Sequence, residues 1–218
     1  GRRAQFNVAI RTVVLDRARG TAVYGVGSGI VWDSDAAAEF EECRLKTRVL
    51  SVPPARPFRL LESLRWTPAA GYDLRAAHLR RLADSAEYFG YPLAPTAVAA
   101  RLDALAAGLP GPAKVRLLVD AAGHIEVEAR PLAEGALPQP ARLGLARQPV
   151  SSADVWLYHK TTRRGVYEAA RAGRPDCDEV ALWNERGELT EATASNLVLI
   201  LDGRAWTPPV SAGLLAGT

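Results

Sequence analysis

The chain has 218 residues, of which 48% are hydrophobic, and this is enough for a buried core in one ordinary domain or two small ones. Its net charge of +3 comes from basic residues that are spread along the sequence, so a nucleic-acid surface is not indicated. No signal peptide is visible in the sequence, and it has no apolar run long enough for a membrane span. Its two distant cysteines, Cys43 and Cys177, lead us to expect a cytoplasmic protein.

The first part of the chain predicts two strands and a helix. The strands are expected over residues 6–15 and 21–24, and the helix over residues 36–50. Asp35 closes a cluster of N-capping residues immediately before that helix. Three prolines then fall within five residues, and proline cannot sit inside a helix or a central strand. We therefore predict domain 1–50 and a proline-rich linker over 51–57.

The remainder predicts an α+β unit with two lobes, residues 58–135 and 136–218. In the first lobe we expect a strand over 58–66, helices over 74–89 and 96–105, and a hairpin of strands 113–119 and 124–129. In the second lobe we expect strands over 143–147, 179–183, 195–201 and 204–206, and a helix over 164–172. Thr96 is the expected cap of its helix.

Both ends of the sequence have unusual features. The chain begins at Gly1, contains no methionine, and ends at Thr218 directly after an apolar stretch with no helix stop signal. We expect an internal segment of a longer polypeptide. A processed but complete protein is the alternative.

A glycine-rich segment and two carboxylates mark a candidate site in the first domain. The spacing Gly25-x-Gly27-x-Gly29 does not match a nucleotide loop, but glycines let backbone amides approach an anion. Glu39 and Glu42 are three residues apart and share one helix face, an arrangement that suits Mg²⁺. A solvated acidic helix face is the alternative interpretation.

The wider sequence of this domain resembles the C-terminal end of the chorismate-binding enzymes, which include anthranilate synthase and aminodeoxychorismate synthase component I. The matching strings are residues 6–12, 24–35 and 39–46. The resemblance implies the following roles: a substrate carboxylate on Arg11, a chorismate pocket lined by Gly27, Ser28, Gly29 and Ile30, and Mg²⁺ on Glu39 and Glu42. Only the last part of that fold is present, so this segment alone is not expected to bind chorismate.

Lys160 is the most informative residue of the second unit. The chain has only three lysines (Lys46, Lys114 and Lys160), and arginine cannot replace lysine in a Schiff base. Glu191 follows in a Thr-Glu-x-x-x-Ser-Asn turn. This pattern indicates pyridoxal phosphate (PLP), which needs a lysine for its aldehyde and an acid facing its pyridine nitrogen.

The same cofactor needs a cradle for its phosphate group. Arg81 can supply bidentate contacts, and the backbone amides of Gly217 and Thr218 could complete the cradle at a helix start. Each residue also has a purely structural interpretation: Lys160 as a surface lysine, Glu191 as a turn cap, and Arg81 as a solvated helix residue.

Taken together, these residues resemble the fold-type IV PLP enzymes, the family of branched-chain and D-amino-acid aminotransferases and of 4-amino-4-deoxychorismate lyase. The matching strings are 58–65, 78–86, 114–117, 159–164, 178–179, 187–197, 207–208 and 214–218. The resemblance implies that Lys160 forms the Schiff base, Glu191 faces the pyridine nitrogen and Arg81 binds the phosphate. It also implies cofactor contacts by Ser195 and Asn196, with Arg164 as a phosphate-side candidate.

The sequence departs from that family in two places. The strand that normally precedes residue 58 is replaced by the proline linker, and the second lobe stops at the phosphate-binding turn. We therefore expect the C-terminal end of a chorismate-binding α/β fold followed by a fold-type IV domain that is truncated at its C-terminus.

The order of the two parts suggests a function that neither part gives alone. It resembles a fused aminodeoxychorismate synthase component I and aminodeoxychorismate lyase, a cytoplasmic, multifunctional enzyme of folate biosynthesis that makes 4-aminobenzoate from chorismate. A glutamine amidotransferase partner that supplies ammonia and a homodimer through the PLP domain are implied. The alternatives are an aminotransferase for branched-chain or D-amino acids, and a non-catalytic fragment.

Overall fold

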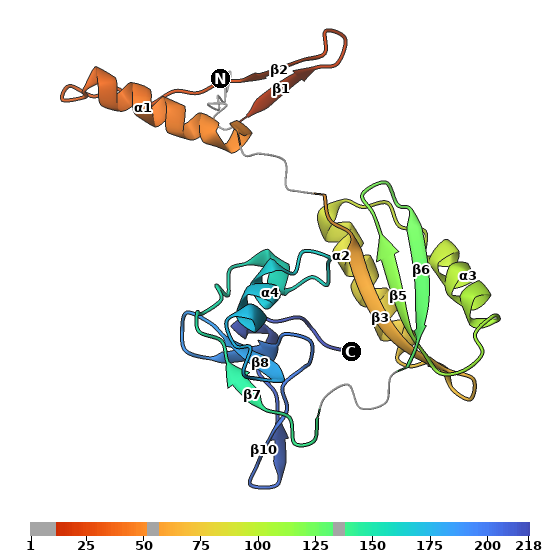
Figure 1. Ribbon diagram of the computed structural model, residues 1–218. Coiled ribbons are helices and arrows are strands. Elements are labelled where there is room, and N and C mark those ends of the chain that lie inside the picture. Colours follow the sequence, from red (N-terminus) through yellow and green to blue (C-terminus); the bar gives the residue numbers. More distant parts are fainter. Residues whose placement is uncertain (1–11, 52–56, 133–137) are drawn as a thin grey trace, which may run out of the picture. The chain divides into compact units, whose positions relative to one another are not determined.

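The computed structural model describes residues 12–51, 57–132 and 138–218 (Figure 1). The chain divides into two compact units, residues 1–56 and 57–218, and the division falls inside the proline-rich segment. In the described part, no helix has the length and apolar character needed to cross a membrane. Arg11, expected to bind a substrate carboxylate, lies outside the described residues, as does most of the strand predicted over 6–15.

The first unit contains a two-stranded hairpin and one helix. Strands β1 (Val13–Asp16) and β2 (Thr21–Tyr24) pair antiparallel, and Gly20 takes the left-handed conformation at the turn between them. Helix α1 (Ala36–Thr47) begins after Asp35, whose carboxylate accepts a hydrogen bond from the amide of Ala38 at 2.9 Å. The predicted cap is thus confirmed. The helix ends earlier than predicted, and a short 3-10 turn (Arg48–Ser51) follows it.

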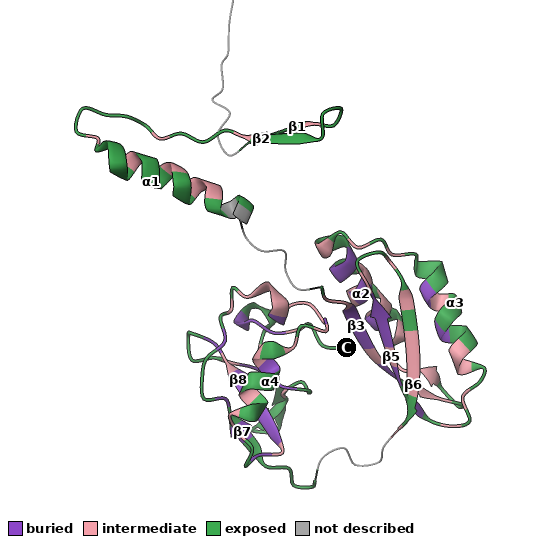
Figure 2. Ribbon diagram, turned by 45° about the horizontal axis from the view of Figure 1, so that its top comes forward, coloured by how far each residue is buried: buried purple, intermediate pink, exposed green. Residues whose placement is uncertain are grey.

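The first lobe of the second unit is a four-stranded antiparallel sheet in the order β4-β3-β5-β6. Its strands are β3 (Leu60–Thr67), β4 (Gly71–Tyr72), β5 (Ala113–Val119) and β6 (Ile125–Pro131). Helices α2 (Arg75–Phe89) and α3 (Pro95–Ala106) supply the apolar residues that cover one face. Figure 2 shows β3 and β5 as the buried strands of this sheet.

The period-2 alternation of β3 decides what lies on each face of the sheet. Leu60 and Leu64 join the core with residues of α2 and α3. The intervening positions, Leu61 and Ser63, point to the opposite face and line a cavity there. One strand therefore supplies both the core of this lobe and a wall of a cavity.

The second lobe contains a smaller sheet in the order β7-β8-β9. Strand β7 (Leu143–Leu145) is parallel to β8 (Glu179–Trp183), and β9 (Leu189–Ala192) is antiparallel to β8. Helix α4 (Gly165–Ala172) contributes Tyr167 to the core around Val180 and Leu182. Two 3-10 turns (Val155–Leu157 and Val210–Ala212) complete the lobe.

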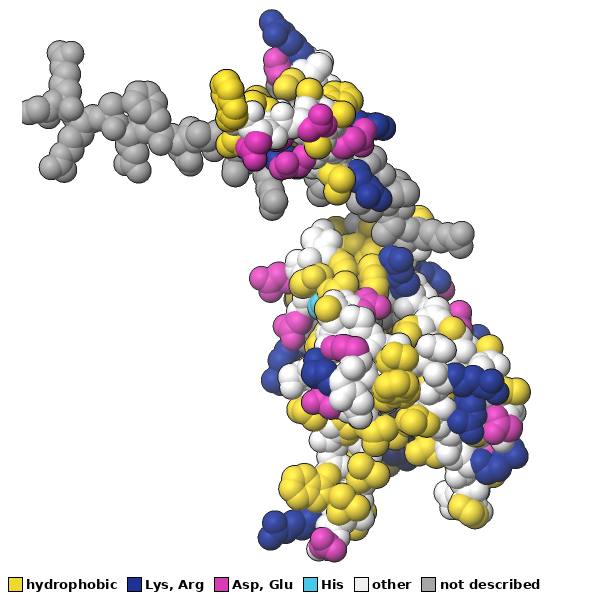
Figure 3. Space-filling view, turned by 90° about the vertical axis from the view of Figure 1, so that its left-hand side faces the viewer, with side chains coloured by type: hydrophobic (Ala, Val, Ile, Leu, Met, Phe, Trp, Pro, Cys, Tyr) yellow, Lys and Arg dark blue, Asp and Glu magenta, His cyan; other side chains and the backbone are white. Residues whose placement is uncertain are grey.

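A hairpin of β10 (Leu199–Leu201) and β11 (Arg204–Trp206) projects from this lobe with its apolar side chains exposed. Figure 3 shows hydrophobic side chains gathered at the end of the unit where Figure 1 places β10. Ile200 is 67% exposed and Trp206 is 55% exposed, so this hairpin contributes little to the described core.

Three sequence predictions about the second unit were wrong in detail. Residues 189–192 form β9 and not a turn, and the strand predicted over 195–201 is limited to Leu199–Leu201. Helix α3 is capped by Ala94 and begins at Pro95, because proline is favoured at the first helical position, so Thr96 is not the cap. Residues 214–218 have no regular secondary structure, and the expected helix start at Gly217 and Thr218 stays a prediction.

Candidate functional site

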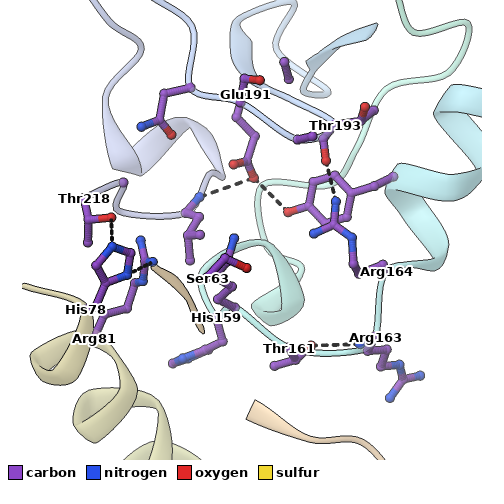
Figure 4. Close-up of a pocket in the computed structure, with 18 residues that line it drawn as sticks. Ser63, His78, Arg81, His159, Thr161, Arg163, Arg164, Glu191, Thr193 and Thr218 are labelled. Carbon is purple, nitrogen blue, oxygen red and sulfur yellow. Dashed lines mark hydrogen bonds between the residues drawn. The ribbon is translucent and has the colours of Figure 1, made fainter. Parts of the chain in front are cut away.

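A cavity of about 310 Å³ lies in the second unit and is lined by residues of both lobes (Figure 4). It brings together all eight residues that the sequence predicts around a cofactor: Arg81, Lys160, Arg164, Glu191, Ser195, Asn196, Gly217 and Thr218. These positions are up to 137 residues apart in the chain, so their convergence is a property of the fold. The volume is within the range of about 300–1,000 Å³ that is usual for small-molecule sites.

Lys160 is held in place by its main chain. Its carbonyl oxygen accepts a hydrogen bond from the amide of Leu61 at 2.9 Å, and the amide of Thr162 donates to the carbonyl of Arg59 at 2.9 Å. The segment that carries Lys160 is thereby attached to the beginning of β3. Burial, together with the nearby charge of Arg81, lowers the pKa of the Lys160 amine below its ordinary value of 10.5. The amine of Lys160 is thus easier to deprotonate than that of an exposed lysine.

Glu191 lies on β9 and is only 6% exposed. Its Oε1 accepts a hydrogen bond from the hydroxyl of Tyr167 at 2.8 Å and one from the amide of Leu215 at 3.4 Å. Burial raises the pKa of this carboxyl, and the Tyr167 hydrogen bond acts in the opposite direction. The buried Glu191 carboxylate, hydrogen-bonded to the Tyr167 hydroxyl, is therefore suited to share a proton with the ring nitrogen of a bound ligand.

Tyr167 is a site residue that the sequence predictions missed. It lies on α4 three positions after Arg164, whose guanidinium is 4.5 Å from the centre of the Tyr167 ring. Burial and the neighbouring Glu191 raise the pKa of the Tyr167 hydroxyl, so it stays protonated and donates. Its i, i+3 spacing from Arg164 was the one signal in the sequence that could have identified it.

The residues around Ser195 form a second hydrogen-bonded group. Arg164 Nη2 donates to the carbonyl oxygen of Thr193, and the Thr193 hydroxyl donates to Glu179, which is buried. The Ser195 hydroxyl donates to the same carboxylate at 3.4 Å. These contacts fix the loop after β9 along one wall of the cavity.

Asn196 and Gly217 are packed directly against each other. A Cβ atom added at Gly217 would lie 2.3 Å from the amide nitrogen of Asn196, so a larger residue at 217 would require the Asn196 side chain to move. The Gly217 backbone and the side-chain amide of Asn196 therefore lie close together, and both line the cavity together with Thr218.

Arg81 is anchored on the other side of the cavity. Its Nε and Nη2 donate to Glu62 at 2.8 and 2.6 Å, and Nη1 donates to the carbonyl of Ala216 at 2.8 Å. His78, one turn earlier on α2, also contacts Glu62 and has Nε2 at 3.3 Å from the Thr218 hydroxyl. Glu62 and His78 occur in the family-like strings of the sequence but were not predicted as site residues.

A second cavity, of about 300 Å³, adjoins the first and shares Ser63 and Arg164 with it. Its lining is strongly basic. The residues are Leu61, Ser63, Lys114, Arg116, Glu128, Arg130 and Arg164. The one acid among them, Glu128, is paired with Arg116 at 3.3 Å. Apart from Arg164, which precedes α4, the side chains come from one face of the β3-β5-β6 sheet. Their excess of positive charge suits an anionic ligand.

In the first unit, the structure connects the glycine-rich segment to α1. Lys46 Nζ donates to the carbonyl of Gly27 at 2.8 Å and pairs with Glu42 at 2.7 Å. Glu39 accepts a hydrogen bond from the Ser34 hydroxyl at 2.8 Å, and a hydrogen bond from Ser28 lowers the pKa of its carboxyl. A Cβ at Gly29 would meet no atom within 4 Å, so the backbone there is open.

These contacts are a partial match to the expected Mg²⁺ site. Oε2 of Glu39 is buried and has no hydrogen-bond partner among the described residues, whereas Glu42 would have to exchange Lys46 for the metal. Among residues 12–51, 57–132 and 138–218, no three His, Cys, Asp or Glu side chains are grouped to hold a metal ion. A Mg²⁺ ion here would therefore need other oxygen ligands, from substrate or water.

The sequence profile of the family described as amino-transferase class IV matches residues 59–218, and that of the chorismate binding enzymes matches residues 1–51. The chain belongs to the class IV aminotransferase family. It combines this family's α+β fold with the C-terminal end of a chorismate-binding segment. No curated protein sequence matches it.

Solved structures of the same fold agree with this assignment. A Mesorhizobium loti protein assigned as an amino-acid aminotransferase is 35% identical, with a TM-score of 0.66 over 73% of this chain and 79% of its own. A Legionella pneumophila protein assigned as a 4-amino-4-deoxychorismate lyase is 18% identical, with a TM-score of 0.65 over 73% of this chain and 65% of its own. A branched-chain aminotransferase from Thermobaculum terrenum, solved with PLP, is 18% identical, with a TM-score of 0.63 over 72% of this chain and 60% of its own. The chain thus spans less than two thirds of the last two proteins, and these show the fold alone.

The cavity residues fit the PLP of this family. They provide a primary amine with a lowered pKa, a buried carboxylate, and an arginine whose Nη1 keeps one N–H beyond its contact with Ala216. Asn196 and Thr218 add polar groups at the same end as Arg81. Amine, carboxylate and anion-binding groups are the three parts that this cofactor requires.

Proposed function

We propose that residues 58–218 form a PLP-dependent 4-amino-4-deoxychorismate lyase domain joined to the end of an aminodeoxychorismate synthase component I. Its product would be 4-aminobenzoate, for folate biosynthesis. The observation that carries this proposal is the match of one chain to both the chorismate binding enzymes and the class IV family. In this proposal domain 1–50 ends at linker 51–57, and the PLP domain has lobes 58–135 and 136–218.

The roles of the site residues follow from their geometry. Lys160 Nζ would bind the cofactor and then act as general base and acid, taking a proton from the substrate ring and returning one to the enolpyruvyl group. The lowered pKa of Lys160 supports this, because a general base must be neutral before it can accept a proton. When bound, PLP supplies an electron sink for the substrate amine. Glu191 would keep the proton on the pyridine nitrogen, and Tyr167 would keep Glu191 charged.

The other end of the cavity would hold the phosphate group. Arg81 would donate to it from its free N–H, and Asn196, Gly217 and Thr218 would complete the cradle. Arg164 and Ser195 would position the loop after β9 through Thr193 and Glu179.

The basic cavity supports a substrate with more than one carboxylate. Aminodeoxychorismate carries a ring carboxylate and an enolpyruvyl carboxylate, and both must be placed near the reactive amine of Lys160. Lys114, Arg116 and Arg130 line a cavity that adjoins the Lys160 cavity at Ser63 and Arg164. Arginine pairs well with carboxylates through two parallel hydrogen bonds, so this cavity would orient the acidic groups of the substrate.

An aminotransferase is the second candidate. The Mesorhizobium loti relative is assigned as an amino-acid aminotransferase and is 35% identical over 73% of this chain. Lys160 and Glu191 serve either reaction. The two functions differ in their products, since the lyase releases pyruvate whereas an aminotransferase passes the amino group to a second oxo acid.

The proposal includes partners that the chorismate-binding segment implies. A glutamine amidotransferase would deliver ammonia for chorismate amination, Mg²⁺ would be bound through Glu39 and Glu42, and Arg11 with Gly27, Ser28 and Gly29 would contact chorismate. A homodimer through the PLP domain and a cytoplasmic location belong to the same proposal.

The first test is covalent trapping of the cofactor. The chain is incubated with PLP, reduced with borohydride and digested, and the labelled peptide is identified by mass spectrometry. We expect a visible absorption band and a label on Lys160, both lost in Lys160→Ala and kept in the control Lys46→Ala. A label that persists in Lys160→Ala, or that is shared with Lys46 and Lys114, would refute the cofactor assignment.

The second test separates the two reactions. Purified protein is supplied with aminodeoxychorismate, and pyruvate and 4-aminobenzoate are measured; in parallel it is supplied with leucine or D-alanine and 2-oxoglutarate. We expect pyruvate and 4-aminobenzoate in equal amounts and no glutamate. Formation of glutamate without pyruvate would refute the lyase function and support the aminotransferase function.

A further inference from the structure

A buried carboxylate lies behind the cofactor cavity without lining it. Glu62 is on β3 and is 1% exposed, and the alternation of the strand points it to the same face as Leu60 and Leu64. Its neighbours Leu61 and Ser63 point to the opposite face of the sheet, where they line the basic cavity. A charged group inside an apolar core is costly unless it is fully paired, so the contacts of Glu62 require an explanation.

Within the described residues, the Glu62 carboxylate forms hydrogen bonds with two residues of α2. Arg81 donates through Nε to Oε1 at 2.8 Å and through Nη2 to Oε2 at 2.6 Å, which is a bidentate pair. His78 Nδ1 is 2.7 Å from Oε2. Burial alone would raise the pKa of Glu62, but the hydrogen bonds from Arg81 and His78 outweigh it, and the pKa is lowered. The bidentate contact with Arg81 fits an ionised Glu62, which can only accept hydrogen bonds, and His78 then donates to it from Nδ1.

Both partners of Glu62 line the cavity and face the same short segment. Arg81 Nη1 donates to the carbonyl of Ala216, and His78 Nε2 is 3.3 Å from the Thr218 hydroxyl. Figure 4 shows the His78 ring between Arg81 and Thr218. Because the Nδ1 proton is donated to Glu62, the ring cannot turn without losing that bond, and Nε2 stays on the cavity side.

We propose that Glu62 is a positioning residue for the phosphate group of PLP: it fixes the guanidinium of Arg81 and, through His78, holds the Thr218 hydroxyl, so that both groups are placed to bind the phosphate. The proposal rests on the function proposed above. It differs from a simple structural role, in which the Glu62 pairs would only attach α2 to β3. The two roles can be separated because pyridoxal has the same aldehyde and pyridine ring as PLP but no phosphate.

The test is a pair of binding titrations on the full chain. The affinities for PLP and for pyridoxal are measured by absorbance and tryptophan fluorescence in wild type, Glu62→Gln, His78→Phe and the control Asp103→Asn, which removes the Arg75–Asp103 ion pair between α2 and α3. We expect Glu62→Gln to weaken PLP binding by about tenfold or more and to leave pyridoxal binding unchanged. The control should keep both affinities.

Each outcome decides the proposal. Equal loss of PLP and pyridoxal binding in Glu62→Gln, or no loss of either, would show that Glu62 does not serve the phosphate group. If Glu62→Gln does not fold, as judged by circular dichroism, His78→Phe decides, since it leaves the Glu62–Arg81 pair in place: a selective loss for PLP supports the proposal and its absence overturns it. If the wild-type protein binds no PLP through Lys160, the proposed function and this inference are both refuted. If the wild type binds PLP but the variants lose PLP and pyridoxal affinity equally, only the inference is refuted.

Discussion

The hydrogen bond between Tyr167 and Glu191 gives the most direct test of the site electrostatics, and Tyr167→Phe removes it without removing the ring. The bond is 2.8 Å long, and its partners are 8% and 6% exposed, so water cannot easily replace the lost donor. The remaining donor to the same oxygen, the Leu215 amide, is at 3.4 Å and is a weak substitute.

The loss of unfolding free energy in Tyr167→Phe depends on the charge of the acceptor, Glu191. Removing a hydrogen bond to a charged buried group costs about 1.5–3 kcal/mol of unfolding free energy, compared with about 0.5–1.5 kcal/mol for a neutral pair. Burial already raises the pKa of Glu191, and loss of the Tyr167 donor raises it further. The folded state then binds more protons than the unfolded state between pH 4.5 and the folded pKa, so the Glu191 contribution to stability falls as the pH rises through that window.

The assay is urea unfolding of wild type and Tyr167→Phe over a series of pH values. Because Tyr167 stabilises the ionised carboxylate, the destabilisation should be largest above the folded pKa of Glu191 and should shrink at lower pH. Tyr158→Phe is the matched control, since Tyr158 donates to the neutral carbonyl of Ser152 at 2.7 Å. A destabilisation by Tyr167→Phe that is independent of pH, or no larger than that of the control, would refute this account of Glu191.

Three further predictions address the nucleophile, the basic cavity and the core. Acylation of Lys160, resolved by peptide mapping, should be half-maximal at a pH below 10.5 in the folded protein, because burial and Arg81 lower its pKa; a midpoint at or above that value contradicts the geometry. Arg116→Met should raise the KM for aminodeoxychorismate by about tenfold while PLP binding is kept, and Arg65→Met, its control, should change neither quantity. Leu117→Ala, at a fully buried position of β5, should cost about 2–5 kcal/mol in urea unfolding, and a cost under ~1 kcal/mol would mean that this core is loosely packed.

Most helices and strands of the second unit were predicted correctly from local sequence patterns. The hairpin of residues 113–119 and its partner strand, helices α2 and α4, and strand Glu179–Trp183 all lie where periodicity and turn residues placed them. The predicted cap at Asp35 is confirmed because capping depends on neighbouring residues only. Thr96 was misplaced because two capping signals, Thr96 and Pro95, compete within two positions.

The site residues that the sequence missed depend on contacts between distant segments. Glu62 and Arg81 are 19 residues apart, and Tyr167 and Glu191 are 24 apart, so no periodicity relates them. Strand β9 was taken as a turn because its four residues include Thr190 and Glu191, which are polar although buried. Their polarity is explained by the cavity and its hydrogen bonds, which a linear pattern does not contain.

The main-chain attachment of Lys160 to β3 has a consequence for how the protein can be followed in solution. The amides of Leu61 and Thr162 are both donors in bonds that join the segment around Lys160 to the start of the first sheet. Hydrogen–deuterium exchange at these two amides would therefore report separation of the lobes directly, independently of any catalytic turnover. A bound ligand that contacts both lobes should slow exchange at this pair more than at amides inside β5.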